Sequence, residues 1–323
     1  MRIAVINDTS IRRHFGCTAV MQTILSAIND FGHDVVFRWP VGLDWTSAAE
    51  NGLFDDIDLV LVNGEGSIHN SATRHRTRQL CKLGPFAARE LGVPVHLVNS
   101  TIAALDKAAL NDLRHFSSIS VRETVSCRYL QDYGLKSEVV PDLSLGHAAP
   151  PVEERKAVLV TDSIVDPAAH VLEETAERIS GRFISFQKKK RSLLEKLTFR
   201  GKANTPIKGA NLPRALERDL DRILRDFSGC QVLLTGRFHA FCLAILSRTP
   251  VIAVESNTHK IGAMAMDVFG SSDRVVESET ATVESLVAMV PVAGFSELET
   301  QAIEAFLEKA SMARCQMWER ILA

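Results

Sequence analysis

The chain alternates short, continuous apolar runs with longer segments of helical periodicity, and this alternation constrains the fold more than any other feature. The runs are rich in β-branched residues and lack interleaved polar positions, as strands do when helices cover both faces of a parallel sheet. In the first half they lie at residues 3–6, 59–62, 93–98 and 118–121. Apolar residues recur every three or four positions in the intervening segments, at 17–31, 74–91, 103–116 and 123–133. We therefore expect an α/β fold with parallel sheets.

The alternation restarts after a turn-rich and then charged stretch at residues 146–155. Expected strands lie at 158–160, 183–186, 232–234 and 251–254, and expected helices near 170–179, 213–227 and 238–247. A chain of 323 residues is longer than one hydrophobic core usually supports. The pattern predicts two Rossmann-like domains, at 1–145 and 156–295. It also predicts a long amphipathic helix within 296–323, which we expect to pack back on the first domain.

Composition excludes several classes of protein. A formal net charge of −2 gives no case for nucleic-acid binding by the whole chain. The six cysteines are scattered without a paired C-x-x-C spacing, which favours reduced thiols over disulfides or a metal site. The first residues form an expected strand and not a signal peptide, and no apolar run is long enough to span a membrane. We expect a cytoplasmic protein with no bound metal.

A strongly basic segment runs from Lys188 to Lys208 and contains the single acid Glu195. One interpretation is a solvated loop. The other is a basic lid that meets an anionic acceptor or an acidic membrane surface, which would place the protein peripherally on the inner face of the membrane. Both interpretations remain open.

The most informative segment for function is the strand end and helix start that carries Gly236, Arg237, Phe238 and His239. Open α/β sheets bind ligands at such strand ends, and the backbone N–H groups of a helix start favour anions. Arg237 can clamp an anion, and His239 adds a titratable group. Taken alone, Arg237 could simply pair with a surface carboxylate, and His239 could be a structural histidine at a helix start. Together they favour a binding site, to which Lys260 would add a further cation.

A second candidate element follows the expected strand at 59–62 and contains Gly64, Glu65, Gly66 and Ser67. Its glycines allow the backbone to approach a ligand closely. The segment is neither a Walker loop nor a full G-x-G-x-x-G sequence, so it supports no ATP or NAD site. A carboxylate between two glycines is available to orient sugar hydroxyls or to move a proton.

Polar residues also follow the other expected strands of the first domain. Asn7 and His14 lie in the loop after the first strand, Arg122 directly follows residues 118–121, and Asp142 follows Val140 and Pro141. Parallel strands deliver their carboxyl ends to one edge of a sheet. We therefore expect these residues to face the strand ends of the second domain across an interdomain cleft.

These residues resemble those of the polysaccharide pyruvyl transferase family. The likeness is carried by residues 58–67, 120–126, 140–142 and 235–260, the last with the pattern T-G-R-x-H-A followed by a proline and a lysine. The chain departs from the family where consecutive glycines are often found, at 63–66, and where Gly16-Cys17 replaces a Gly-Asp pair. The resemblance implies a GT-B-like arrangement, with the acceptor on the first domain and the donor on the second.

The resemblance also implies a reaction. The family moves pyruvate from phosphoenolpyruvate onto two sugar hydroxyls as a ketal, on a surface glycan or its lipid-linked precursor, without a cofactor. Arg237 and Arg122 would hold the anionic groups of the donor, His239 would be the acid, and Asp142 or Glu65 would be the base. Two alternatives remain: a GT-B-like glycosyltransferase that uses a nucleotide sugar, and a non-catalytic protein that binds sugar or phosphate.

Overall fold

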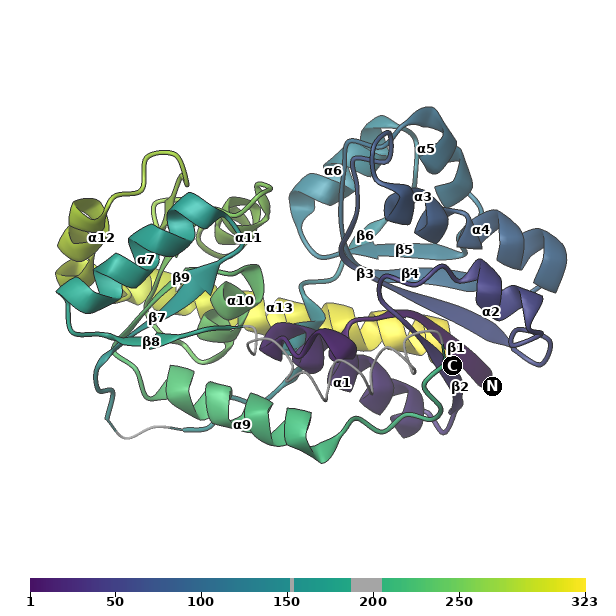
Figure 1. Ribbon diagram of the computed structural model, residues 1–323, viewed down its shortest axis with the longest axis horizontal. Helices are drawn as coiled ribbons and strands as arrows, with labels where there is room; N and C mark the ends of the chain where they lie inside the picture. Colours follow the sequence, from purple (N-terminus) through teal and green to yellow (C-terminus); the bar gives the residue numbers. More distant parts are fainter. Residues whose placement is uncertain (152–153, 187–204) are drawn as a thin grey trace.

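The computed structural model describes residues 1–151, 154–186 and 205–323. It has two α/β domains, each built on a parallel sheet covered by helices (Figure 1). This confirms the predicted fold class. The part of the basic segment before residue 205 lies outside the described residues.

The N-terminal sheet has six strands in the order β2-β1-β3-β4-β5-β6. Their bounds are β1 (Arg2–Asp8), β2 (Asp34–Pro40), β3 (Leu59–His69), β4 (Val95–Ala103), β5 (Ser118–Val121) and β6 (Glu138–Val139). The helices are α1 (Phe15–Asp30), α2 (Thr46–Glu50), α3 (His75–Cys81), α4 (Leu83–Phe86), α5 (Lys107–Leu113) and α6 (Thr124–Asp132), with the 3₁₀ turns η1 (Ser10–Arg12) and η3 (Leu143–Gly146) and the π-helical turn η2 (Ala87–Leu91). The single helix expected at 74–91 is instead divided into α3, α4 and η2, near the helix-breaking pair Gly84-Pro85.

The glycine-containing segment at residues 63–69 was expected to follow a strand at 59–62, and instead it belongs to that strand. It continues β3 to His69, because pairing with β4 resumes beyond an irregularity between Glu65 and Ile68. Gly64 is required there: a Cβ atom would lie 2.5 Å from the Cβ of Ser100 on β4. The glycines of this segment therefore serve the packing of two neighbouring strands as well as the approach of a ligand.

The C-terminal sheet has five strands in the order β11-β10-β9-β7-β8. Their bounds are β7 (Val158–Ser163), β8 (Arg182–Ile184), β9 (Val232–Gly236), β10 (Val251–Val254) and β11 (Val275–Val276). The helices are α7 (Asp166–Arg178), α9 (Arg214–Ser228), α10 (Phe238–Leu246), α11 (Lys260–Phe269) and α12 (Val283–Met289), followed by η4 (Val290–Val292). The strand order reverses between β1 and β3 in one sheet and between β7 and β9 in the other. Ligands bind outside the carboxyl ends of the strands at such points.

Helix α13 (Glu297–Leu322) connects the two domains (Figure 1). It begins with a capping box between Ser296 and Glu299. Its first half contributes Phe306 to the core of the C-terminal domain, and its last turns bury Met317 and Trp318 against strands of the N-terminal sheet. No helix in the described parts of the chain is long and apolar enough to cross a membrane.

The chain also returns to the N-terminal domain before α9. The guanidinium of Arg38, which is 2% exposed, donates to the Asp8 carboxylate at 2.9 Å and to the carbonyls of Gly209 and Asn211. The backbones of Arg38 and Ile207 form an antiparallel bridge. Residues 207–212 therefore contact the N-terminal sheet, although they fall within the span expected for the second domain.

Replacing Trp318 by alanine should destabilise the protein by about 3–5 kcal/mol, because it removes a buried aromatic side chain from the contact between α13 and the N-terminal core. Chemical denaturation followed by circular dichroism measures this. Leu298→Ala on the same helix is the matched control, since Leu298 is 77% exposed. Equal effects of the two substitutions would show that the end of α13 does not hold the domains together.

Candidate functional site

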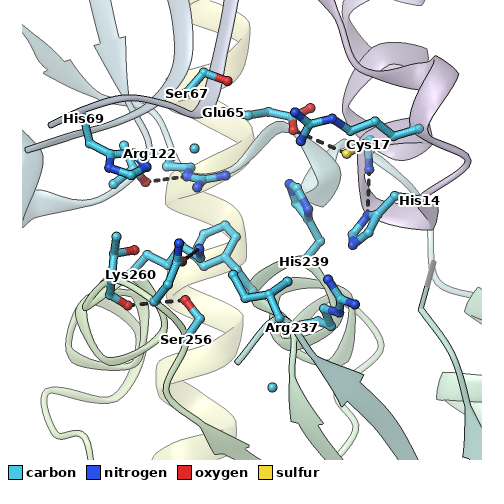
Figure 2. A pocket seen from close by; sticks show the side chains of 18 of the residues that line it. His14, Cys17, Glu65, Ser67, His69, Arg122, Arg237, His239, Ser256 and Lys260 are labelled. Atoms are coloured by element: carbon cyan, nitrogen blue, oxygen red, sulfur yellow. Dashed lines mark hydrogen bonds between the residues drawn. The ribbon is translucent and has the colours of Figure 1, made fainter. Parts of the chain in front are cut away.

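A cavity of about 370 Å³ lies between the two domains, where the carboxyl ends of both sheets meet. Figure 2 shows side chains of the N-terminal domain along one wall and those of the C-terminal domain along the other. The described residues that line it are Arg12, His14, Cys17, Glu65, Gly66, Ser67, His69, Arg74, Thr101, Arg122, Ile164, Gly236, Arg237, Phe238, His239, Ser256, Asn257, Thr258 and Lys260. Ten of the thirteen site residues expected from the sequence line this cavity, and His14 is among them.

 

Three of the expected site residues do not line this cavity: Asn7, Gly64 and Asp142. Asn7 is 3% exposed and donates to the Asn63 carbonyl at 2.6 Å and to Ser67 Oγ at 3.4 Å. It therefore supports the wall of the cavity from beneath. Gly64 packs against Ser100 on β4. Asp142 is fully buried and pairs with Arg122.

Glu65 is the one carboxylate among the described residues that line the cavity. It is 4% exposed and accepts hydrogen bonds from Thr9 Oγ1, from Asn63 Nδ2 at 3.1 Å and from Cys17 Sγ at 3.4 Å. Its φ of 40° lies in the left-handed region, which non-glycine residues rarely adopt. The surrounding hydrogen bonds hold this uncommon backbone, and the carboxylate, in one position.

Arg122 and Asp142 form a buried ion pair, with 2.9 Å between Nη1 and Oδ2. Arg122 is 2% exposed; its Nε donates to Thr101 Oγ1 at 2.7 Å, and its guanidinium lies 4.0 Å over the ring of Phe238. Burial alone would raise the pKa of Asp142, but His239 and Arg122 together hold it below its usual value. Asp142 is therefore ionised, and its charge is committed to these two partners.

Arg237 and His239 come from the start of α10, as the sequence predicts. Arg237 makes a two-pronged ion pair with Asp162 at the end of β7, with both N–O distances 2.9 Å. His239 Nε2 lies 3.6 Å from Asp142 Oδ2. Burial lowers the pKa of His239 below its usual value, although the negative charges of Asp142 and Glu65 oppose the shift.

Lys260 begins α11 and approaches the cavity from the side opposite Glu65 (Figure 2). Burial, and next the charge of Arg122, lower its pKa to about 8, although Glu255 opposes the shift. Its Nζ donates to Asn257 Oδ1 at 3.1 Å. The positive charge of Lys260 is therefore poorly stabilised in the free protein, and a bound anion would stabilise it.

The cavity also contains residues that the sequence analysis missed. They include Arg12, Cys17, His69, Arg74 and Thr101, and, after β10, the run Ser256, Asn257 and Thr258. The rule that selected Arg122 and Arg237, a polar residue directly after a strand, would also have selected the run after β10. The pairing of Arg74 with His69 had no such signal, because it depends on the unexpected length of β3.

The two domains touch directly beside the cavity. Gly16 near the start of α1 packs against His239, and a Cβ atom on Gly16 would lie 2.1 Å from His239 Cβ and 2.6 Å from its Nδ1. The ring centroids of His14 and His239 are 5.5 Å apart. The helix starts of both domains therefore meet at this point, and only glycine permits so close an approach.

A family model described as polysaccharide pyruvyl transferase matches residues 14–258. The match includes both helix starts and nearly all of the cavity wall. This chain belongs to the polysaccharide pyruvyl transferase family. The resemblance seen in the sequence is thereby confirmed. A search of curated protein sequences found no significant match.

The chain is similar in fold to several solved structures, two of which name UDP or UDP-GlcNAc in their titles. The S. aureus MnaA-UDP co-structure has a TM-score of 0.57 at 12% identity, covering 94% of this chain and 91% of that one. The Methanocaldococcus jannaschii UDP-GlcNAc 2-epimerase, in complex with UDP-GlcNAc and UDP, has a TM-score of 0.56 at 13% identity, covering 92% and 94%. A glycotransferase of kitacinnamycin has a TM-score of 0.52 at 11% identity, covering 100% and 99%. These likenesses confirm the GT-B-like arrangement of the pyruvyl transferase domains.

Replacing Gly16 by alanine should destabilise the protein by about 1–3 kcal/mol, because the added methyl group overlaps His239 and forces the helix starts apart. The thermal midpoint measures this effect. Gly294→Ala is the control, since a Cβ atom there meets nothing within 4 Å. An unchanged midpoint for Gly16→Ala would contradict the close approach of the domains.

Proposed function

We propose that this protein transfers pyruvate from phosphoenolpyruvate to two hydroxyls of a sugar, as a ketal, on a surface glycan or its lipid-linked precursor in the cytoplasm. The observation that carries the proposal is the charge of the cavity. Five cationic side chains are among its described lining residues, against the single carboxylate of Glu65: Arg12, Arg74, Arg122, Arg237 and Lys260. A small, strongly cationic cavity suits a compact ligand with several negative charges.

The donor fits the C-terminal wall of the cavity. Phosphoenolpyruvate carries a phosphate and a carboxylate, and Arg237 offers a planar guanidinium that binds such groups by paired hydrogen bonds. Asp162 holds Arg237 in place by its two-pronged ion pair. The N-terminus of α10 adds backbone N–H groups and a partial positive charge on the same side. Lys260 supplies a further cation.

The proposed chemistry begins with protonation of the donor's methylene carbon. His239 gives this proton, and a sugar hydroxyl forms a bond to the adjacent carbon while Glu65 accepts the hydroxyl proton. The second hydroxyl then attacks that carbon and gives its proton to the deprotonated His239, while the bond from the carbon to the phosphate oxygen breaks, so the ketal forms and phosphate leaves. A bound trianionic donor favours the protonated imidazole, which offsets the effect of burial on His239.

Asp142 has a positioning role in this proposal and is not the base. Its carboxylate contacts Arg122 and faces His239 Nε2, so it orients one cation and one titratable ring. Glu65 lines the cavity and accepts hydrogen bonds from neutral donors, which leaves its charge available to a hydroxyl.

Nucleotide-sugar transfer is the alternative reaction, and one contact disfavours it. A nucleotide base usually needs an aromatic face for stacking. Phe238 is the one Phe, Tyr or Trp among the described lining residues, and Arg122 already covers its ring at 4.0 Å. Phosphoenolpyruvate needs no such face.

Phosphoenolpyruvate should raise the thermal midpoint of the wild-type protein, whereas UDP- and CMP-sugars should not, because a ligand of the native state stabilises it. Arg237→Lys keeps the charge but loses the paired hydrogen bonds, so it should lose most of this stabilisation. Arg248→Ala, which removes a half-exposed arginine paired with Glu304 outside the cavity, is the control. Stabilisation by a nucleotide sugar alone would support the glycosyltransferase alternative, and binding of phosphoenolpyruvate without turnover would support a non-catalytic protein.

Phosphoenolpyruvate should bind more weakly as the pH rises through the range in which Lys260 loses its proton. The pKa of this amine is about 8 in the free protein, and a bound anion raises it. Lys260→Gln should bind more weakly near neutral pH and lose this part of the pH dependence. Titration calorimetry across several pH values measures both effects. Lys156→Gln, on an exposed lysine, is the control, and an identical pH profile in Lys260→Gln would contradict the role of Lys260.

A further inference from the structure

Three side chains with nitrogen or sulfur donors converge where the two domains touch. The ligand atoms of His14, Cys17 and His239 all lie within 4.8 Å of one another, and all three residues are part of the cavity wall. Figure 2 shows His14 and Cys17 on the α1 side and His239 opposite them on the α10 side. Two imidazoles and a thiol are the donor types that Zn²⁺ prefers.

The backbone positions the three donors for one ion. His14 is the N-cap residue of α1 and Cys17 lies in its first turn, so the capping hydrogen bond brings the two residues together. Gly16 between them lets His239 approach, and His239 Nδ1 is the ring nitrogen closest to that contact. His14 Nδ1 accepts a hydrogen bond from the Cys17 N–H at 3.4 Å, so its Nε2 remains for a metal.

The surrounding carboxylates match what a zinc site requires. His239 Nε2 faces Asp142 Oδ2 at 3.6 Å, and a carboxylate behind the second ring nitrogen is the usual partner of a zinc-binding histidine. Glu65 Oε2 lies 3.4 Å from Cys17 Sγ. Bonds of about 2.0–2.3 Å place two ligand atoms of one tetrahedral ion about 3.3–3.8 Å apart, so Cys17 and Glu65 are already spaced like two ligands of one ion.

We propose that His14, Cys17 and His239, with Glu65 as the fourth ligand, bind one Zn²⁺ ion that joins the two domains. The donor atoms of His14, Cys17 and His239, at most 4.8 Å apart, reach ligand spacing by a contraction of about 1 Å, and the Glu65 carboxylate moves toward them to complete the tetrahedron. The ion replaces the thiol proton of Cys17 and neutralises the charges of the resulting thiolate and of Glu65.

The metal-bound form is inactive in pyruvyl transfer, a consequence that rests on the proposed function. Zn²⁺ occupies His239 and Glu65, which are the proposed acid and base. Metal binding itself is measured without donor or acceptor, so the two proposals can fail separately. If Zn²⁺ binds at this site and transfer continues undiminished, the assignment of His239 and Glu65 to proton transfer is overturned while the metal site stands.

The test is metal binding by the full chain after removal of metal with a chelator. Wild-type protein should take up one Zn²⁺ per chain, measured by elemental analysis after dialysis. With Co²⁺ as the probe, it should show the near-ultraviolet absorption of a cobalt–thiolate bond. Cys17→Ser should lose this band and bind Zn²⁺ at least about 100-fold more weakly, since loss of even an outer partner costs 10- to 100-fold.

Two matched variants keep the test specific. Cys315→Ser removes an exposed free thiol and should bind like the wild type. His14→Gln should weaken Zn²⁺ binding while retaining Cys17, which separates a shared site from a lone reactive thiol. Circular dichroism establishes that each variant is folded. Wild-type protein without stoichiometric Zn²⁺, or binding that survives in Cys17→Ser or is lost in Cys315→Ser, would overturn the proposal.

Discussion

The buried ion pair between Arg122 and Asp142 is the interaction on which the arrangement of the site depends. Arg122 ends one strand of the N-terminal sheet, and Asp142 faces both Arg122 and His239 of the other domain. A buried charge is tolerated only when it is paired and hydrogen-bonded, so each of the two ions fixes the other. Through this pair, the edge of one sheet determines where the helix start of the opposite domain lies. The ring of Phe238 packs against the same guanidinium and completes the link.

The cavity wall concentrates positive charge in a space partly removed from water. Its cations repel one another, and this repulsion adds to burial in lowering the pKa of Lys260. The free protein therefore carries an unfavourable electrostatic energy that an anion relieves on binding. Aspartates outside the cavity reduce this energy at two places, where Asp162 pairs with Arg237 and Asp142 with Arg122. Sites with strongly perturbed titratable groups of this kind are frequently functional.

Much of the fold and part of the site could be predicted because parallel strands follow simple rules. Continuous apolar runs indicate buried strands, and polar residues directly after them meet at one edge, which selected Arg122 and Arg237. Depth could not be predicted in this way: Asn7 and Asp142 also follow strands, yet they lie beneath the cavity wall. Contacts between segments far apart in sequence left no local pattern either. The approach of Gly16 to His239 and the return of residues 207–212 to Arg38 are set by tertiary packing alone.

The repeated passage of the chain between the domains has a consequence for ligand binding. After the first domain is complete, residues 207–212 and the end of α13 both lie against it again. Each return of the chain holds the two domains together, so the two walls of the cavity face each other at a high effective concentration. The entropy of bringing them together is lost when the chain folds and not when a substrate arrives. A small ligand, which has few contacts with which to close two domains, can therefore bind between them.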